Sequence, residues 1–271
     1  MTPAREGLLS HIDPGTPRTK LISQACEQAE CTYNSRCFEV KKESLVEALT
    51  DIPFDLDTES LMKQLRVVPG TDDAREFHDL LNMAKHNGKP KAMYAECFIE
   101  AKGHDTVRIE GTTFTSLTLR RALDTVERVF PFVVTCGHEI DETITVKGDF
   151  LKEFWRDTVK ASLLSSASRY LCDYLHRKFR LSKTAIMSPG SGDVTVWPIE
   201  QQKELFALLG DVHRHIGVTL TDSCLMVPNK TVSGVRFPTE KDFRTCQVCH
   251  REHCPSRSAP FDEEVWASMQ S

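Results

Sequence analysis

The sequence predicts a mixed α/β fold in which strands and helices alternate and one long helix occupies the second half of the chain. Three observations support this prediction. Apolar residues recur at every second position within residues 91–114, they recur at helical spacing within residues 150–180, and no unit of sequence repeats. With 271 residues, of which 40% are hydrophobic, the chain can bury a sizeable core in one large or two small domains.

The first clear elements are a helix and a hairpin. From the boundary near Val40 to Gly88 the pattern is helical, with Thr71 and Asp72 as candidate caps and Asn87-Gly88 as a left-handed stop. Its apolar face contains Phe77, Leu80, Leu81 and Ala84. The period then changes to two, so residues 91–114 are predicted to form a β-hairpin around a turn at residues 102–105.

The longest helix is predicted after a shorter helix and a strand. Ser116 can cap the short helix, and the apolar residues 131–137 make a buried strand that ends at a glycine. The long helix covers residues 150–180, and its apolar stripe contains Phe154, Val159, Leu163, Leu171, Leu175 and Phe179. Small residues at 161–168 allow another backbone, most simply the sheet, to approach it closely.

A last α/β segment and two flanking regions complete the organisation. We expect a helix near residues 200–209 and strands near residues 220–227 and 231–237, with a turn at residues 228–230 between the two strands. The domain boundaries are predicted as follows: a polar, cysteine-bearing extension at 1–40, the main domain at 41–240, and a cysteine-rich metal-binding segment at 241–271.

Composition excludes two classes of function. The formal net charge of -5 and the pI of about 6.1 give no basic field for a phosphate backbone, so we expect no nucleic-acid partner. No apolar run reaches the length of a membrane span, and the start of the chain lacks the pattern of a signal peptide, so we expect a cytoplasmic protein without a membrane partner. In that reducing compartment the ten cysteines are expected to be thiols or metal ligands.

Three cysteines near the end of the chain have the spacing of a metal site. Cys246, Cys249 and Cys254 form the pattern C-x2-C-x4-C, and such short loops let soft thiolates converge on one metal centre. The proline that follows Cys254 favours an iron–sulfur cluster, with the 4Fe–4S type expected. Zinc, with His250 or His253 as a further ligand, and unliganded thiols are the alternatives.

A 4Fe–4S cluster needs a fourth ligand, which this segment lacks. Cys224 is close in sequence, Cys26, Cys31 and Cys37 are further candidates, and an open iron bound by substrate or solvent is the alternative. The last three cysteines, spaced x4 and x5, also allow a second metal site or surface thiols.

Three further segments share one resemblance: the helix DTVKASLLSSASRYLCDYLHRKFR, the loop MSPGSGD and the stretch LTDSCLMVPNKTVSG. Together they resemble the activation domain of cobalamin-dependent methionine synthase, and weaker similarity in EGTTFTSLTLRRAL and FPFVVTCGHEIDE extends the match to residues 90–237. The resemblance implies a C-shaped α/β domain with a twisted antiparallel sheet flanked by helices. It also implies that the cofactor pocket is lined by Ser188, Pro189, Gly190, Ser191, Gly192, Asp222, Ser233 and Gly234.

The pocket departs from the family pattern at three positions. The family holds S-adenosylmethionine with an Arg four residues before the loop glycine and a Tyr just after it, where this chain has Ile186 and Ser191. Arg169 stands where the family has an acidic residue. Losing the loop Arg removes a charge-assisted contact of about 1.5 to 3 kcal/mol. We therefore expect no S-adenosylmethionine binding in the family's usual mode, and the loop either approaches the corrin or is a plain turn.

The resemblance and the cysteines together predict an accessory protein of a cobalamin-dependent, methionine synthase-like methyltransferase system. It would be a stand-alone counterpart of the activation domain that docks on a separate corrinoid-binding protein or methionine synthase polypeptide, because the Asp-x-His-x-x-Gly signature of cobalamin binding is absent from this sequence. The cluster would pass on an electron received from a donor such as ferredoxin or flavodoxin. The alternatives are a non-redox binding module with a structural zinc site, and a chain that still methylates cobalamin. No catalytic residue is predicted.

Overall fold

The computed structural model describes residues 45–192, 195–254 and 257–270. All of them belong to one of the two units into which the chain divides, Glu43–Ser271. The predicted extension at residues 1–40, and with it Cys26, Cys31 and Cys37, lies outside the described residues.

The main sheet has seven strands, all paired antiparallel, in the order β4-β3-β2-β5-β9-β6, with β1 also paired to β2. Its strands are β1 (Leu45–Leu49), β2 (Lys91–Lys102), β3 (Thr106–Ile109), β4 (Thr112–Thr115), β5 (Arg128–Thr135), β6 (Thr184–Met187) and β9 (Thr231–Pro238). The predicted hairpin around residues 102–105 is confirmed as β2–β3. β2 pairs with β1 and β5 up to Phe98 and with β3 from Ile99 onward, and an irregularity in the β2–β3 register lies between Ile99 and Ala101.

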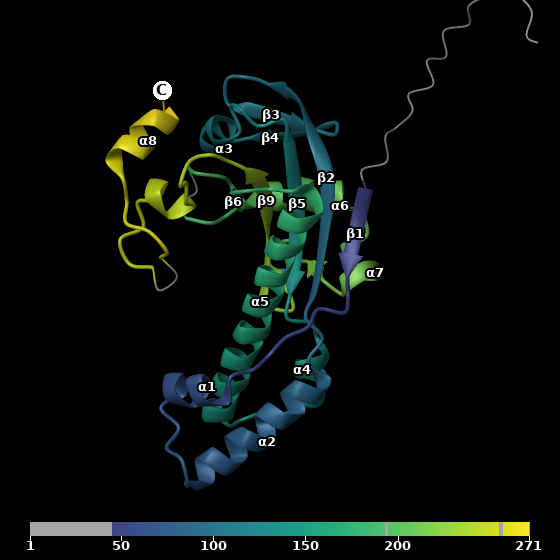
Figure 1. Ribbon diagram of the computed structural model, residues 1–271, viewed down its shortest axis with the longest axis vertical. Helices are drawn as coiled ribbons and strands as arrows, with labels where there is room; N and C mark the ends of the chain where they lie inside the picture. The colour runs from purple at the N-terminus through teal and green to yellow at the C-terminus, as the bar shows by residue number, and fades with distance from the viewer. Residues whose placement is uncertain (1–44, 193–194, 255–256, 271) are drawn as a thin grey trace, which may run out of the picture. The chain divides into compact units, whose positions relative to one another are not determined.

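Helices cover both faces of this sheet. The described helices are α1 (Thr58–Leu65), α2 (Asp72–Asn87), α3 (Leu117–Ala122), α4 (Glu139–Thr143), α5 (Phe150–Phe179), α6 (Gln202–Leu209), α7 (Val212–Ile216) and α8 (Glu263–Gln270), with short 3-10 turns η1 (Ile199–Gln201) and η2 (Thr245–Val248). Of these, α5 packs on one face of the sheet, and α3, α6 and α7 pack on the other. The predicted long helix is confirmed as α5, which runs along one face of the sheet and beyond it to α1 and α2 (Figure 1). None of the described helices combines the length and apolarity needed to cross a membrane.

Successive side chains of β2 point to opposite faces of the sheet and so belong to two different parts of the core. Met93 and Ala95 face the cluster formed with α3, α6 and α7, whereas Ala92 and Tyr94 face the cluster formed with α5. In the second cluster Ala167 of α5 is fully buried against the sheet, as the small residues at 161–168 predict. The fold class predicted from the sequence is therefore confirmed: a mixed α/β domain with a curved antiparallel sheet and one long helix.

Three local predictions were wrong. Residues 45–49 were expected to be helical but form β1, because they pair with the edge of β2. Gly88 is not in the left-handed region, because its φ is -60°. It is required for close packing instead: a Cβ at this position would lie 2.7 Å from the Ala84 carbonyl oxygen and 3.0 Å from Phe54. Phe154 was expected in the apolar stripe of α5, but it is 58% exposed, and Trp155 takes the buried position against Phe77 of α2.

The predicted strand at residues 220–227 is replaced by two short strands. β7 (Thr219–Leu220) and β8 (Met226–Val227) pair with each other around a turn that contains Cys224 at a φ of 61°. The predicted turn at residues 228–230 therefore leads from this small hairpin to β9, which pairs with β5 and β6 in the main sheet.

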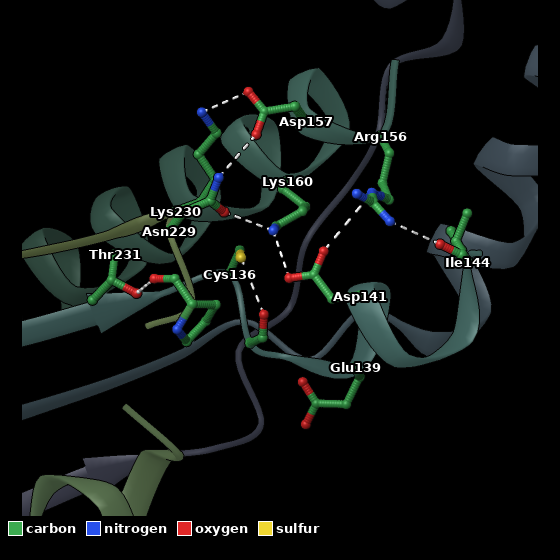
Figure 2. A network of polar contacts seen from close by, with 12 residues as sticks. Cys136, Glu139, Asp141, Ile144, Arg156, Asp157, Lys160, Asn229, Lys230 and Thr231 are labelled. Atoms are coloured by element: carbon green, nitrogen blue, oxygen red, sulfur yellow. Dashed lines mark hydrogen bonds and ion pairs between the residues drawn. The ribbon is translucent and has the colours of Figure 1, made fainter. Parts of the chain in front are cut away.

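A buried lysine ties three elements together next to β9. The Lys160 ammonium of α5 donates to Asp141 Oδ2 of α4 at 2.6 Å and to Asn229 Oδ1 at 2.7 Å (Figure 2). The Lys160 side chain is only 5% exposed, so these two oxygens replace most of its hydration. Because Asn229 lies just before β9, the network fixes where that strand begins.

Candidate functional site: a groove and a thiol cavity

The glycine loop follows β6 and is shaped by its own backbone. The N–H of Gly190 donates to the Trp197 carbonyl at 2.9 Å, and the N–H of Ser191 donates to the Ser188 carbonyl at 3.1 Å. Gly190 has a φ of +71°, and a Cβ there would lie 2.8 Å from Ile199. The loop therefore folds tightly against the chain that leads into α6.

A groove of about 460 Å³ opens beside this loop. It is lined by Thr184, Ala185, Ile186, Ser188, Ser191, Arg236, Asp242, Phe243, Arg244, Thr245, Cys246 and Ser258. Gly234 of β9 makes room for the first loop residue, because a Cβ there would lie 2.5 Å from the Met187 carbonyl oxygen and 2.6 Å from Ser188 Oγ. Two of the predicted pocket residues, Ser188 and Ser191, thus line this groove.

The other predicted pocket residues lie elsewhere or act indirectly. Asp222 is exposed in the turn between β7 and β8 and does not line the groove. Ser233 is buried in β9 opposite Val133 of β5, so it also lies away from the groove. Pro189 and Gly190 belong to the loop without lining the groove.

The cysteine segment docks against the free edge of β6. Thr245 Oγ1 donates to the Ile186 carbonyl at 2.9 Å. The Arg257 guanidinium donates to the carbonyls of Cys246, Cys249 and Ala259 at 3.1 to 3.2 Å, and also to that of Arg251. The Arg257 side chain therefore binds several backbone carbonyls of the cysteine loop and holds the loop together. Trp266 of α8 also packs against this loop, because its ring centroid lies 4.6 Å from that of His250.

The three predicted cysteines line one small cavity of about 100 Å³. Its other lining residues are Ser191, Gly192, Thr245, Arg251 and Arg257. A Cβ at Gly192 would lie 3.1 Å from Cys249 Sγ, so the glycine loop and the thiols are in close contact. The thiol cavity and the groove share Ser191, Thr245 and Cys246, which makes them neighbours with a common wall.

The cavity is not a formed metal site. Within residues 45–192, 195–254 and 257–270, no group of three or more His, Cys, Asp or Glu residues is arranged to hold a metal ion. His250 and His253, the alternative zinc ligands, do not line the cavity, and neither does Cys224, which is buried in the β7–β8 turn. The structure thus brings the three thiols to one cavity without a fourth protein ligand among the residues that line it.

The thiols differ in their electrostatic environment. Burial opposes ionisation of Cys246, but hydrogen bonds from Ser258 and the Ala259 backbone, together with the Arg257 charge, hold the pKa of this thiol below its ordinary value. Burial raises the pKa of Cys136 to about 11 and that of Cys97 to about 12. Cys246 is therefore the thiol with the greater thiolate fraction near neutral pH.

This difference predicts the order of alkylation. With iodoacetamide at pH 7, Cys246 should react at least about tenfold faster than Cys136 or Cys97, because the thiolate is the nucleophile and a pKa difference of one unit changes its fraction about tenfold. Peptide mapping by mass spectrometry measures each rate. Ser258→Ala removes a side-chain donor to Cys246 Sγ and should slow that thiol alone. Equal rates for Cys246 and Cys136 would contradict the assignment.

Sequence reasoning missed the arginines of the site. Arg236, Arg244, Arg251 and Arg257 line the two cavities, yet none of them was predicted to have a role. Arg236 carried a usable signal: a charged residue inside the apolar strand VSGVRFP indicates a buried ion. Arg257 carried none, because its carbonyl partners are set by the fold of the cysteine loop.

Comparisons with known proteins agree with the resemblance seen in the sequence. Residues 124–252 match the family described as "Vitamin B12 dependent methionine synthase, activation domain". A comparison with curated proteins gives no match. Among solved structures, the MetH reactivation domain bound to AdoHcy is similar in fold, with a TM-score of 0.52 and 16% identity over 74% of this chain and 81% of that chain. Over residues 124–252, the chain is thus similar to the activation domain of vitamin B12-dependent methionine synthase, and its fold is similar to that of the MetH reactivation domain.

Proposed function

We propose that this chain serves a cobalamin-dependent methyltransferase system as a redox activation module. It docks on a corrinoid-binding protein or a methionine synthase polypeptide that presents cobalamin, and an iron–sulfur cluster at Cys246, Cys249 and Cys254 delivers the electron. One observation carries the proposal: the cavity lined by these three thiols shares a wall with the groove beside the activation-domain loop. A redox centre there would lie next to the surface that the family resemblance assigns to the cofactor.

The surroundings of the thiols suit an anionic cluster better than zinc. Two guanidinium groups, from Arg251 and Arg257, line the cavity and can balance the charge of several thiolates. Ser258 donates from its backbone N–H and its hydroxyl to Cys246 Sγ, both at 3.4 Å, and hydrogen bonds to sulfur tune cluster potentials. Neither nearby histidine lines the cavity, which removes the simplest fourth ligand for zinc.

When bound, such a cluster supplies one electron at a time, which converts the inactive Co(II) state of a partner's cobalamin to Co(I), and a ferredoxin- or flavodoxin-type donor returns that electron to the cluster. The residues of this chain hold and orient the components. Arg257 keeps the cysteine loop closed, and Thr245 fixes it to β6. Metal binding would draw the three thiolates closer together, because ligand ordering accompanies metal binding in such loops.

Metal content tests the proposal. The full chain is purified without oxygen, reconstituted with iron and sulfide, and analysed for iron, sulfide and zinc together with its absorption spectrum. Bound iron and sulfide are expected in the native chain and should be lost in Cys246→Ser, Cys249→Ser and Cys254→Ser. The matched control is Cys172→Ser, which removes a thiol that does not line the cavity and should keep the cluster.

A second measurement addresses the electron transfer. The reduced native chain, mixed anaerobically with a cobalamin-binding methyltransferase in the Co(II) state, should raise the rate of Co(I) formation, whereas the three cysteine variants should not. Zinc in place of iron would instead indicate a non-redox binding module with a structural metal. Absence of any metal at these cysteines would reject both forms of the metal proposal.

A further inference from the structure

The Arg236 guanidinium is a buried cation without an acidic partner among the described residues. The residue is only 7% exposed, and its Nη1 donates to Thr184 Oγ1 at 2.8 Å. Its Nε is buried with no hydrogen-bond partner in the described part of the chain. Burial lowers the pKa of Arg236, and only the thiol of Cys172 opposes this effect. Because arginine stays protonated in proteins, the charge is present and uncompensated.

The strand register aims this charge into a cavity. In β9 the flanking residues Val235 and Phe237 face the main core, so Arg236 faces the opposite side, where it lies across from Ile186 of β6. There a second cavity of about 220 Å³ meets the groove. It is lined by Phe132, Val134, Ser168, Leu171, Ile186, Ser188, Val232 and Arg236. Arg236, Ile186 and Ser188 belong to both cavities.

The lining defines the chemistry of a fitting ligand. A guanidinium with an unused Nε edge matches a planar oxyanion, which it can hold with two parallel hydrogen bonds. The second cavity contains one cation, two serine hydroxyls and otherwise apolar side chains, so it balances a single negative charge and favours an apolar body beside it. A phosphate dianion would leave its second charge against apolar walls.

We propose that Arg236 is an anion receptor, and that the groove takes a small monocarboxylate whose apolar or aromatic part lies in the cavity between β5, β9 and α5. The inference rests on the proposed function only in that it concerns the ligand of the same site. It does not need a metal at the cysteines. Thr184 acts as a positioning residue, because its hydroxyl fixes one side of the guanidinium.

Calorimetric titration with three probes tests the proposal: 4-phenylbutyrate, phenyl phosphate and S-adenosylhomocysteine. The native chain should bind 4-phenylbutyrate more tightly than phenyl phosphate. Arg236→Met should weaken carboxylate binding by at least about tenfold. Arg236→Lys should also weaken carboxylate binding, because lysine keeps the positive charge but lacks the planar guanidinium that makes two parallel hydrogen bonds. Arg75→Met, which removes an exposed surface charge on α2, is the matched control and should bind like the native chain. If S-adenosylhomocysteine also binds through Arg236, its carboxylate is the recognised group.

Two further readouts separate this inference from a structural role and from the metal proposal. Without ligand, Arg236→Met should unfold at a temperature no lower than the native chain, because the variant removes an unpaired buried charge. Cys249→Ser should keep carboxylate binding, and Arg236→Met should keep the metal content of the native chain. Any of four results would overturn the inference: no binding of either carboxylate by the native chain, undiminished binding by Arg236→Met, tighter binding of phenyl phosphate, or a lower unfolding temperature of Arg236→Met.

Discussion

Replacing Asp141 with alanine is expected to lower the free energy of unfolding by about 3 kcal/mol, because it leaves the buried Lys160 ammonium without its carboxylate. The lysine side chain is 5% exposed and would keep only the Asn229 amide oxygen as a partner (Figure 2). Asp141 is itself 37% exposed, which places the effect at the low end for a broken buried pair. Denaturation by urea, followed by circular dichroism, measures the change.

Two further variants test whether the loss of stability in Asp141→Ala comes from the unpaired Lys160 charge. Lys160→Met removes the charge together with its need for partners, so it should cost only about 1 kcal/mol, and the double variant should be more stable than Asp141→Ala alone. Glu76→Ala is the matched control, since Glu76 of α2 pairs with Lys152 at a more exposed position of α5, away from Lys160, and its replacement should cost less than about 1 kcal/mol. A double variant that is less stable than Asp141→Ala would refute this explanation.

Replacing Gly234 with alanine should lower the free energy of unfolding by about 2 to 3 kcal/mol. The new Cβ would lie 2.5 Å from the Met187 carbonyl oxygen, and this backbone atom can move only if β6 or the start of the loop moves with it. The strand pair that carries Ile186 and Arg236 should loosen as a result, so amide hydrogen exchange should quicken at Met187 and Val235. Urea denaturation and exchange mass spectrometry measure the two effects.

Gly111→Ala separates crowding from backbone strain. Gly111 has a φ of +79°, and nothing lies within 4 Å of an added Cβ. Its replacement should therefore lower the free energy of unfolding by about 1 to 2 kcal/mol, which is the cost of placing an alanine in the left-handed conformation. Exchange in β6 and β9 should stay unchanged in this variant. If Gly234→Ala lowered the free energy of unfolding by less than about 0.5 kcal/mol, the close approach of β9 to the loop would not require a glycine at this position.

The fold was predictable where its determinants are local. The cap at Thr71, the change of period at residue 91 and the stripe of α5 apart from Phe154 each lie within one element, and each is confirmed. The predictions that were wrong depend on neighbours distant in sequence. Gly88 packs against Phe54, which belongs to another segment. Trp155 is buried in place of Phe154, because Phe77 of α2 packs against the face of α5 that carries Trp155.

The candidate site was predictable only in part for the same reason. The spacing of the three cysteines and the loop motif are local signals, and the structure brings both to neighbouring cavities. Arg236 enters the site only because β9 pairs with β6, and Arg257 acts only once the cysteine loop has folded. Asp222 was placed in the pocket by family resemblance, but the β7–β8 hairpin carries it away from the groove.

If the thiols bind a metal and the groove binds a ligand as proposed, the wall shared by the groove and the thiol cavity would couple the two binding equilibria. Ser191 and Thr245 contribute to both spaces, so an occupant that prefers one arrangement of these residues alters the affinity of the other space. Thermodynamic reciprocity requires the two effects to be equal: the factor by which a groove ligand changes metal affinity is the factor by which the metal changes ligand affinity. The small molecule in the groove would therefore set how readily the thiols bind their metal, through the residues that line both spaces.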